Sequence, residues 1–187
     1  MPYLSVSYFK YNGYFMSNDD PMLGGKPKVG VNNDQTVIAN KIIKLVRSQS
    51  YGVLCTTGKE HAYGSLLAYA TVGDLSSIIF ATPTTTRKYQ LLKEQPKVAF
   101  LIDNRDTTQH NFMQVEAITA MGIATQLEKN ELNKPIIDFL TAKHPYLSNM
   151  LNAESFVLFK MQVLRYFYVT RFQEVMEWAP PQNSSLS

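Results

Sequence analysis

The chain has 187 residues, of which 45% are hydrophobic and 18% are charged, and this composition is typical of one globular domain or of one domain with an added arm. The net charge of +3 is too small to indicate nucleic-acid binding, and no apolar run approaches the ~20 residues of a membrane span. Cys55 is the single cysteine, which excludes an internal disulfide and a cysteine-based zinc site and is typical of a protein of the reducing cytoplasm.

Residues 1–33 carry the weakest structural signal. Residues 3–14 are rich in aromatic side chains and could form an arm that packs on a partner, whereas residues 18–33 hold glycine, proline and aspartate without a sustained period and are expected to form a loop. Met16 could be the original start of the chain. We therefore expect an N-terminal arm or loop over residues 1–33.

Residues 34–47 form the first predicted helix, which Asn33 or Asp34 caps. Its apolar residues fall on one stripe, formed by Ile38, Ile42, Leu45 and Val46. This pattern favours a helix that lies as a lid over a barrel.

The β-strand signals begin after this helix and continue to residue 178. The predicted strands are residues 51–57, 62–72, 77–82, 97–103, 115–127 and 156–169, with residues 172–178 as an extension or a seventh strand. Short connections make the first three strands antiparallel, and Gly122 indicates a bulge or a close backbone approach. Further helices are expected at residues 131–143, ending at His144, and at residues 146–151. Six or seven strands with short helices between them predict a mainly β fold, an antiparallel Greek-key barrel, followed by a disordered tail at residues 179–187.

The segment of residues 78–96 carries the most distinctive local pattern. A short apolar strand ends at Pro83, three threonines follow, and Thr86 precedes a helix that ends at Gln95 before Pro96. Arg87 and Lys88 lie in the first turn of that helix, where cations are each disfavoured by roughly 0.3–1 kcal/mol. A bound phosphate would reverse this cost, because N–H groups, threonine hydroxyls and two cations would converge on it. The alternative is an exposed basic helix start whose side chains point into water.

Other chemistry-bearing residues favour structural roles. His61, His110 and His144 lie far apart without neighbouring carboxylates or cysteines at ligand spacing, so we expect no metal site. Cys55 is expected to be buried and inert, and Trp178 to contribute packing. Ser65 lacks the Gly-x-Ser-x-Gly sequence of a hydrolase nucleophile.

In the order of its motifs the chain resembles the pyridoxamine 5'-phosphate oxidase-like flavoproteins, which are FMN-binding split barrels. The matching segments are residues 63–67, 80–89, 95–98, 103–105, 119–122, 139–145 and 165–172. The resemblance spans residues 34–178, which we take as the split-barrel domain. Some of the matching segments are those of a poorly characterised branch of the family. It leaves the N-terminal arm unexplained.

This resemblance implies a homodimer with FMN bound between the two subunits. It implies that Thr86, Arg87 and Lys88 hold the FMN phosphate and that Thr82 ends the flavin-facing strand. The segment Gly64, Ser65 and Leu66 would run its backbone past the isoalloxazine ring, and Gly64 would let a planar ligand approach closely. Asn104 and Arg105 are candidates to reach the flavin from the second subunit, and Gln114 is a weaker candidate.

Departures from the family pattern bear on the substrate. Enzymes that oxidise pyridoxamine phosphate carry an arginine and a lysine where this chain has Tyr63 and Ala68, and an Arg-x-His motif where it has Arg165, Tyr166 and Phe167. We therefore expect an FMN-dependent oxidoreductase for an unknown small substrate, and not a pyridoxamine phosphate oxidase. No residue is singled out as a catalytic acid or base. The alternatives are a non-catalytic flavin or haem carrier or sensor, and a deazaflavin-dependent reductase.

Overall fold

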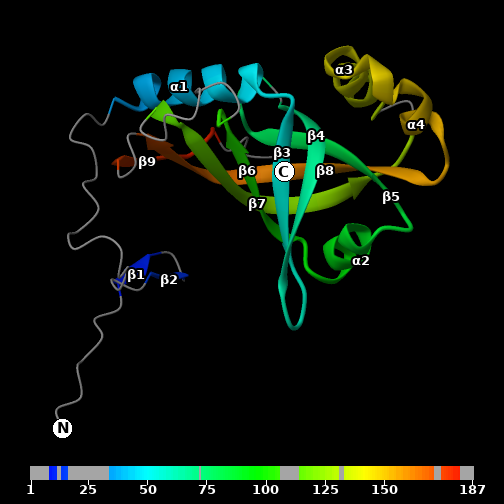
Figure 1. Cartoon of the computed structure of the whole chain (residues 1–187), viewed down its shortest axis with the longest axis horizontal. Coiled ribbons are helices and arrows are strands. Elements are labelled where there is room, and N and C mark those ends of the chain that lie inside the picture. The colour runs from blue at the N-terminus through cyan, green and yellow to red at the C-terminus, as the bar shows by residue number, and fades with distance from the viewer. Residues whose placement is uncertain are drawn as a thin grey trace, which may run out of the picture.

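A computed structural model describes the protein over residues 9–11, 14–16, 34–71, 73–105, 114–130, 133–170 and 174–181 (Figure 1). The main sheet consists of β3 (Tyr51–Thr57), β4 (Ala62–Thr71), β5 (Ser77–Pro83), β6 (Lys97–Asp103), β7 (Ala117–Leu127), β8 (Phe156–Thr170) and β9 (Glu174–Trp178). These strands pair antiparallel in the order β5-β4-β3-β6-β7-β8-β9, and an additional β5–β8 pairing closes the first six into a barrel. The predicted fold class is thereby confirmed, and residues 174–178 form a separate seventh strand.

Short helices close the barrel and cover its outside. They are α1 (Gln35–Ser48), α2 (Arg87–Glu94), α3 (Lys134–Lys143), α4 (Ser148–Asn152) and the single 3-10 turn η3 (Pro145–Leu147). Figure 1 shows α1 lying across one end of the barrel, α2 beside the extended β3–β4 hairpin, and α3 with α4 on a third side. The predicted helix at residue 131 begins later, at Lys134, because Asn133 takes the N-cap position and Pro135 lies in the first turn, and residues 131–132 lie outside the described part.

The predicted lid helix is confirmed. Asp34 caps α1 by accepting a hydrogen bond from the Thr36 amide at 3.0 Å, whereas Asn33 lies outside the described residues. All four residues of the predicted stripe are buried and join the core inside the barrel. Burying such aliphatic side chains contributes roughly 1.5–3 kcal/mol each, so this stripe fixes α1 on the barrel.

Aromatic side chains fill the barrel interior. Tyr69, Phe80, Phe100 and Phe159 are almost completely buried, and the rings of Phe80 and Phe159 stack with centroids 5.6 Å apart. A smaller cluster outside the barrel, formed around Leu140, Leu151 and Leu158, attaches α3 and α4 to the sheet. The core therefore holds the strands that carry the candidate site in a fixed frame.

Two glycines admit the closest backbone approaches in this frame. A Cβ atom on Gly122 would lie 2.1 Å from the Gln162 carbonyl oxygen, and the β7–β8 register shifts between Met121 and Gly122. The predicted bulge and close approach at Gly122 are both confirmed. A Cβ on Gly52 would lie 2.3 Å from the ring of Phe100, a requirement that the sequence pattern did not reveal.

The strand bounds differ from the predictions mainly at the ends. β7 begins at Ala117 instead of residue 115, because the Glu116 amide donates to the Asn104 side-chain oxygen at 2.8 Å. β4 ends at Thr71, and residues 72, 171–173 and 182–187 lie outside the described residues. Pro180, in the predicted tail, is buried.

A small hairpin precedes the barrel in sequence. Its strands β1 (Phe9–Tyr11) and β2 (Tyr14–Met16) pair antiparallel, with Phe9 opposite Met16. The sequence predicted only an arm or loop here. The expected loop at residues 18–33 lies outside the described residues.

Candidate functional site

Among the residues that the structure describes, no strand lies beside one edge of β4 over most of its length. β4 pairs with β3 continuously from Ala62 to Ala68, but it pairs with β5 only over Tyr69–Thr71. In an antiparallel strand, alternate residues direct both backbone N–H and C=O groups to the same edge. The stretch 62–68 therefore offers a row of backbone donors and acceptors that no described strand occupies.

The side chains of this stretch alternate between the barrel interior and the outer face. Ser65 is buried with its hydroxyl unpartnered among the described residues, whereas Gly64 is exposed and Leu66 is 69% exposed. Because the Ser65 hydroxyl points into the barrel, only its backbone can serve a ligand outside. A Cβ on Gly64 would meet nothing closer than the Val53 side chain at 3.4 Å, so the outer surface is open at this point.

The helix α2 begins close to this open edge. Thr86 is its N-cap residue, as predicted, but the Thr86 hydroxyl donates to the Pro83 carbonyl at 2.8 Å and lies 2.9 Å from the hydroxyl of Thr82. No side chain therefore caps the first turn of α2 within the described residues, and no acidic residue lies in it. The Tyr89 amide donates to the Thr86 carbonyl at 3.1 Å, so the amides of Arg87 and Lys88 are the ones that remain for an external acceptor.

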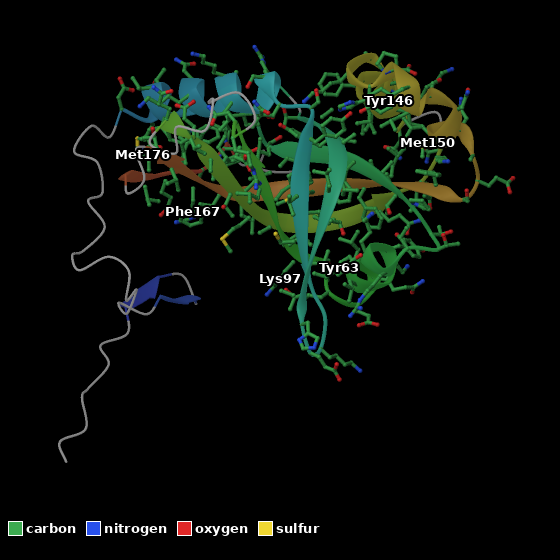
Figure 2. The ribbon with its side chains drawn as sticks, in the orientation of Figure 1. Tyr63, Lys97, Tyr146, Met150, Phe167 and Met176 are labelled. Atoms are coloured by element: carbon green, nitrogen blue, oxygen red, sulfur yellow. The ribbon has the colours of Figure 1, made fainter. Side chains whose placement is uncertain are left out.

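Two cations flank these amides. The Arg87 guanidinium lies 5.3 Å from the centre of the Tyr63 ring on β4, a cation–π contact that joins the helix start to the open edge. Figure 2 shows Tyr63 between the β3–β4 hairpin and α2. Lys88 is half-buried, and its desolvation lowers the pKa of its ammonium group. A bound anion would favour the charged form of Lys88, so this turn can accept a phosphate or a carboxylate.

The remaining predicted residues lie elsewhere on β4 and β6. Leu66 and Arg105 line a groove of about 570 Å³ together with Tyr51 and Gly52. Arg105 makes a bidentate ion pair with Asp103, with both N–O distances 2.6 Å, and is 67% exposed. Burial raises the pKa of Asp103 while the Arg105 bonds lower it, and the net direction is downward.

Asn104 stabilises the connection between two strands. It bridges the end of β6 to the start of β7, because its side-chain oxygen accepts from the Glu116 amide and its own amide donates to the Glu116 carbonyl at 3.2 Å. Gln114 is exposed and follows residues 106–113, which lie outside the described part of the chain. The structure thus brings Thr82, Thr86, Arg87 and Lys88 together beside β4, and places Leu66 with Arg105 in a second group.

Cys55 departs from its prediction. It lies on the outer face of β3 and is half-buried, because alternate residues of this strand point away from the core. Cys55 lines a second hollow of about 260 Å³ with Lys97, Met121 and Leu164. Burial raises the pKa of its thiol, which keeps the thiolate fraction small at neutral pH.

A hydrogen-bonded chain of aromatic side chains ends at the groove, and sequence reasoning missed it. His144 caps the C-terminus of α3, as predicted, but it is also fully buried, with Nε2 2.8 Å from the Tyr69 carbonyl and Nδ1 3.0 Å from the Tyr146 hydroxyl. The Tyr146 hydroxyl in turn donates to that of Tyr51 at 3.0 Å. The only available signal was a histidine and a tyrosine flanking Pro145, which by itself indicates a helix end.

Within the described residues, no group of three His, Cys, Asp or Glu side chains is placed to hold a metal ion. No helix in that part of the chain is long and apolar enough to cross a membrane.

Solved structures with the same architecture are numerous, although no protein-family model and no curated protein sequence matches the chain. A haem-binding protein from Mycobacterium smegmatis is similar with a TM-score of 0.67 and 15% identity, over 75% of this chain and 57% of that one. The present chain thus spans little more than half the length of that protein.

Two further structures cover most of their own length. A FAD-binding protein from Mesorhizobium loti is similar with a TM-score of 0.57 and 13% identity, over 70% of this chain and 92% of that one. A candidate pyridoxamine 5'-phosphate oxidase from Listeria innocua is similar with a TM-score of 0.54 and 15% identity, over 69% and 95%. The chain therefore has the split-barrel fold of the pyridoxamine 5'-phosphate oxidase-like proteins, as its motifs predicted.

Proposed function

We propose that the protein binds FMN and acts as a flavin-dependent oxidoreductase on a small molecule. The observation that carries this proposal is the start of α2, where two cations and uncapped amides lie beside the open edge of β4. The similarity in fold to a FAD-binding protein supports a flavin. The pair of cations and the open edge match the two ends of such a molecule, an anionic phosphate and a planar ring with a polar edge.

The residues present fit the parts of FMN in a definite order. Arg87 and Lys88 would hold the phosphate together with Thr86, whose hydroxyl would turn from the Pro83 carbonyl to the phosphate while it stays beside the Thr82 hydroxyl. The backbone of the stretch 64–66 would offer hydrogen bonds to the ring edge, and the exposed Leu66 side chain would pack against its face. A bound flavin supplies the electron transfer, while these groups bind and orient it and exclude water.

We further propose a homodimer with the cofactor between its subunits. Large apolar side chains remain exposed on the outer barrel face, among them Leu66, Met121 and Leu164. A second copy covering this face would remove them from water, and Asn104 and Arg105 of that copy are our candidates to approach the cofactor. The single cysteine supports a cytoplasmic location.

Haem is the second candidate, because structural neighbours include the haem-binding protein from Mycobacterium smegmatis and a haem storage protein from Vibrio cholerae. Haem propionates are anions that the same α2 turn could accept. A Soret band on haem titration, with no uptake of FMN, would favour a haem carrier. Selective uptake of a deazaflavin would favour the third possibility, a deazaflavin-dependent reductase.

The deciding experiment is an FMN titration of the purified protein, followed by flavin fluorescence and sedimentation. We expect Arg87→Ala and Lys88→Ala each to weaken binding about 10-fold or more, since a hydrogen bond to a charged group contributes about 1.5–3 kcal/mol. Lys93→Ala is the matched control, because Lys93 lies in the last turn of the same helix and is exposed. Absence of FMN uptake by the wild-type protein, or equal weakening by the Lys93 change, contradicts the proposal.

The substrate prediction has a separate test. Tyr63 and Ala68 occupy positions where pyridoxamine phosphate oxidases carry cations, so we expect the FMN-loaded protein not to oxidise pyridoxamine phosphate. Measuring pyridoxal phosphate formation with the loaded protein checks this. Turnover of NAD(P)H with an added electron acceptor would separate an oxidoreductase from a passive flavin carrier.

A further inference from the structure

A cavity of about 340 Å³ lies between α1, α3 and the β4–β5 turn, and none of the predicted cofactor residues lines it. Its wall is mainly apolar, with Ile43, Leu75 and Phe139 contributing side chains. Its polar groups are Arg47, Thr71 and Lys143. The volume falls in the range that accommodates a small organic molecule.

Lys143 lies in this wall in a position that is unusual for a lysine. Its ammonium group donates to the Gln49 carbonyl at 2.9 Å and to the Val46 carbonyl at 3.3 Å, and it lies 4.1 Å from the centre of the Tyr69 ring. These contacts fix the amine at the C-terminus of α1. Val46, whose carbonyl accepts one of these hydrogen bonds, also lines the cavity, so the amine is held beside the cavity wall.

None of the described residues that line the cavity carries a carboxylate to balance its two cations. Within the described residues, neither Arg47 nor Lys143 forms an ion pair. Burial lowers the pKa of Lys143 to about 8, so a sizeable fraction of this amine is neutral near physiological pH. The cavity thus combines a partly desolvated amine with the guanidinium of the exposed Arg47.

The turn that closes the cavity is strained. Leu75 has a φ of 63°, the one positive φ of a non-glycine residue within the described part of the chain. Its side chain is 2% exposed, and its carbonyl accepts a hydrogen bond from the Tyr166 hydroxyl at 2.8 Å. Strained backbone that is held this firmly tends to occur at ligand sites, because the surrounding packing preserves the shape of the wall.

We propose that Lys143 forms an imine with a small carbonyl compound that carries a carboxylate, and that Arg47 pairs with that carboxylate. The neutral Nζ attacks the carbonyl carbon, its two N–H hydrogens pass to the carbonyl oxygen, which leaves as water, and a C=N bond remains. The hydrogen bonds to the Val46 and Gln49 carbonyls orient the amine before the attack and are given up as the imine forms, and the apolar wall accepts the body of the compound. The inference does not depend on a bound flavin.

The experiment uses 4-carboxybenzaldehyde as the probe, sodium cyanoborohydride to reduce any imine to a stable amine, and peptide mass mapping of the full chain. At pH 7.5 an amine with a pKa of about 8 has about 200 times more neutral form than an ordinary lysine, and the weaker nucleophilicity of the less basic amine leaves about a tenfold advantage. We expect Lys143 to be labelled about tenfold faster than the exposed Lys44 of α1.

Two variants and a second probe provide the controls. Arg47→Gln should reduce labelling of Lys143 several-fold, and 4-methylbenzaldehyde, which lacks the carboxylate, should show the same reduction with the wild-type protein. Lys143→Arg should abolish the modification while keeping the cation that caps α1, and circular dichroism will report its folding. Equal labelling of Lys143 and Lys44 would overturn the proposal, and so would a preference that ignores both Arg47 and the carboxylate.

Discussion

Gly52 on β3 and Gly64 on β4 lie in the same two-stranded ribbon, and we expect them to respond differently to a single added methyl group. In Gly52→Ala the new Cβ would lie 2.3 Å from Phe100 Cε1 and 2.8 Å from the Leu101 carbonyl oxygen. Neither neighbour can yield easily, because the Phe100 ring is fully buried against Tyr69, with centroids 5.3 Å apart, and Leu101 is paired in β6. We therefore expect destabilisation in the upper part of the range of about 1–3 kcal/mol for overpacked cores.

Gly64→Ala is the matched comparison. Its Cβ would meet only the Val53 side chain at 3.4 Å, an ordinary contact, and would point to the open outer face. We expect a change in unfolding free energy within about 0.5 kcal/mol, as for surface substitutions in general. Gly64→Leu should likewise fold, but it should weaken FMN binding because its side chain would occupy the surface assigned to the ring.

The assay is urea unfolding of the cofactor-free protein, followed by circular dichroism and tryptophan fluorescence. A loss of about 2 kcal/mol corresponds to a fall in Tm of roughly 4–8 °C for a domain of this size. A Gly52→Ala protein as stable as the wild type would show that the packing around Phe100 is looser than described. A Gly64→Ala protein as unstable as Gly52→Ala would contradict the open outer face on which the candidate site depends.

Three further predictions concern the stability of the barrel and its dependence on pH. Asp34→Ala removes the α1 cap and should cost about 1 kcal/mol in urea unfolding. Gly122→Ala should cost more than that, because its Cβ would lie 2.1 Å from the backbone oxygen of Gln162, and a loss below 0.5 kcal/mol in the same assay would argue against the bulge. Burial lowers the pKa of His144 in the folded protein below its usual 6.5. The stability that the neutral His144 contributes is therefore present above pH 6.5 and is lost as the pH falls toward the folded-state pKa. His144→Gln should flatten the dependence of the unfolding free energy on pH between pH 7 and pH 5.

Much of the fold was predictable because local signals and tertiary packing agree. The stripe of α1, the alternation of β3 and β6 and the helix stop at Pro96 each follow from residue spacing, and the structure preserves them. The N-terminal hairpin at residues 9–16 and the late start of α3 were missed. Both depend on backbone pairing and turn bonds, such as the Asn133 amide donating to Asn130, that leave no hydrophobic period to detect.

Residues of the candidate site could be predicted from the sequence only where they lie together in one short segment of the chain. Arg87 and Lys88 could be recognised from the sequence because they are cations in the first turn of a helix, where the helix dipole disfavours positive charge. The structure places no acidic residue in that turn. The buried His144 could not be found in this way, because its partners Tyr69 and Tyr51 come from distant strands. The inward direction of Ser65 likewise follows only from the closure of the barrel.

The position of the site follows from the way the barrel closes. β5 pairs with β8 along its whole length but with β4 over three residues, so the β4 edge opens beside the point where α2 begins. Under the proposed function, any ligand with an anionic end and a planar apolar body would meet the same two features there. Structures with this fold include a protein described as FAD-binding and one described as haem-binding, so the fold by itself does not decide the ligand. Under the proposed function, specificity would depend on the exposed side chains near the edge, Tyr63, Leu66 and Arg87, and changing these should alter the choice of ligand without altering the barrel.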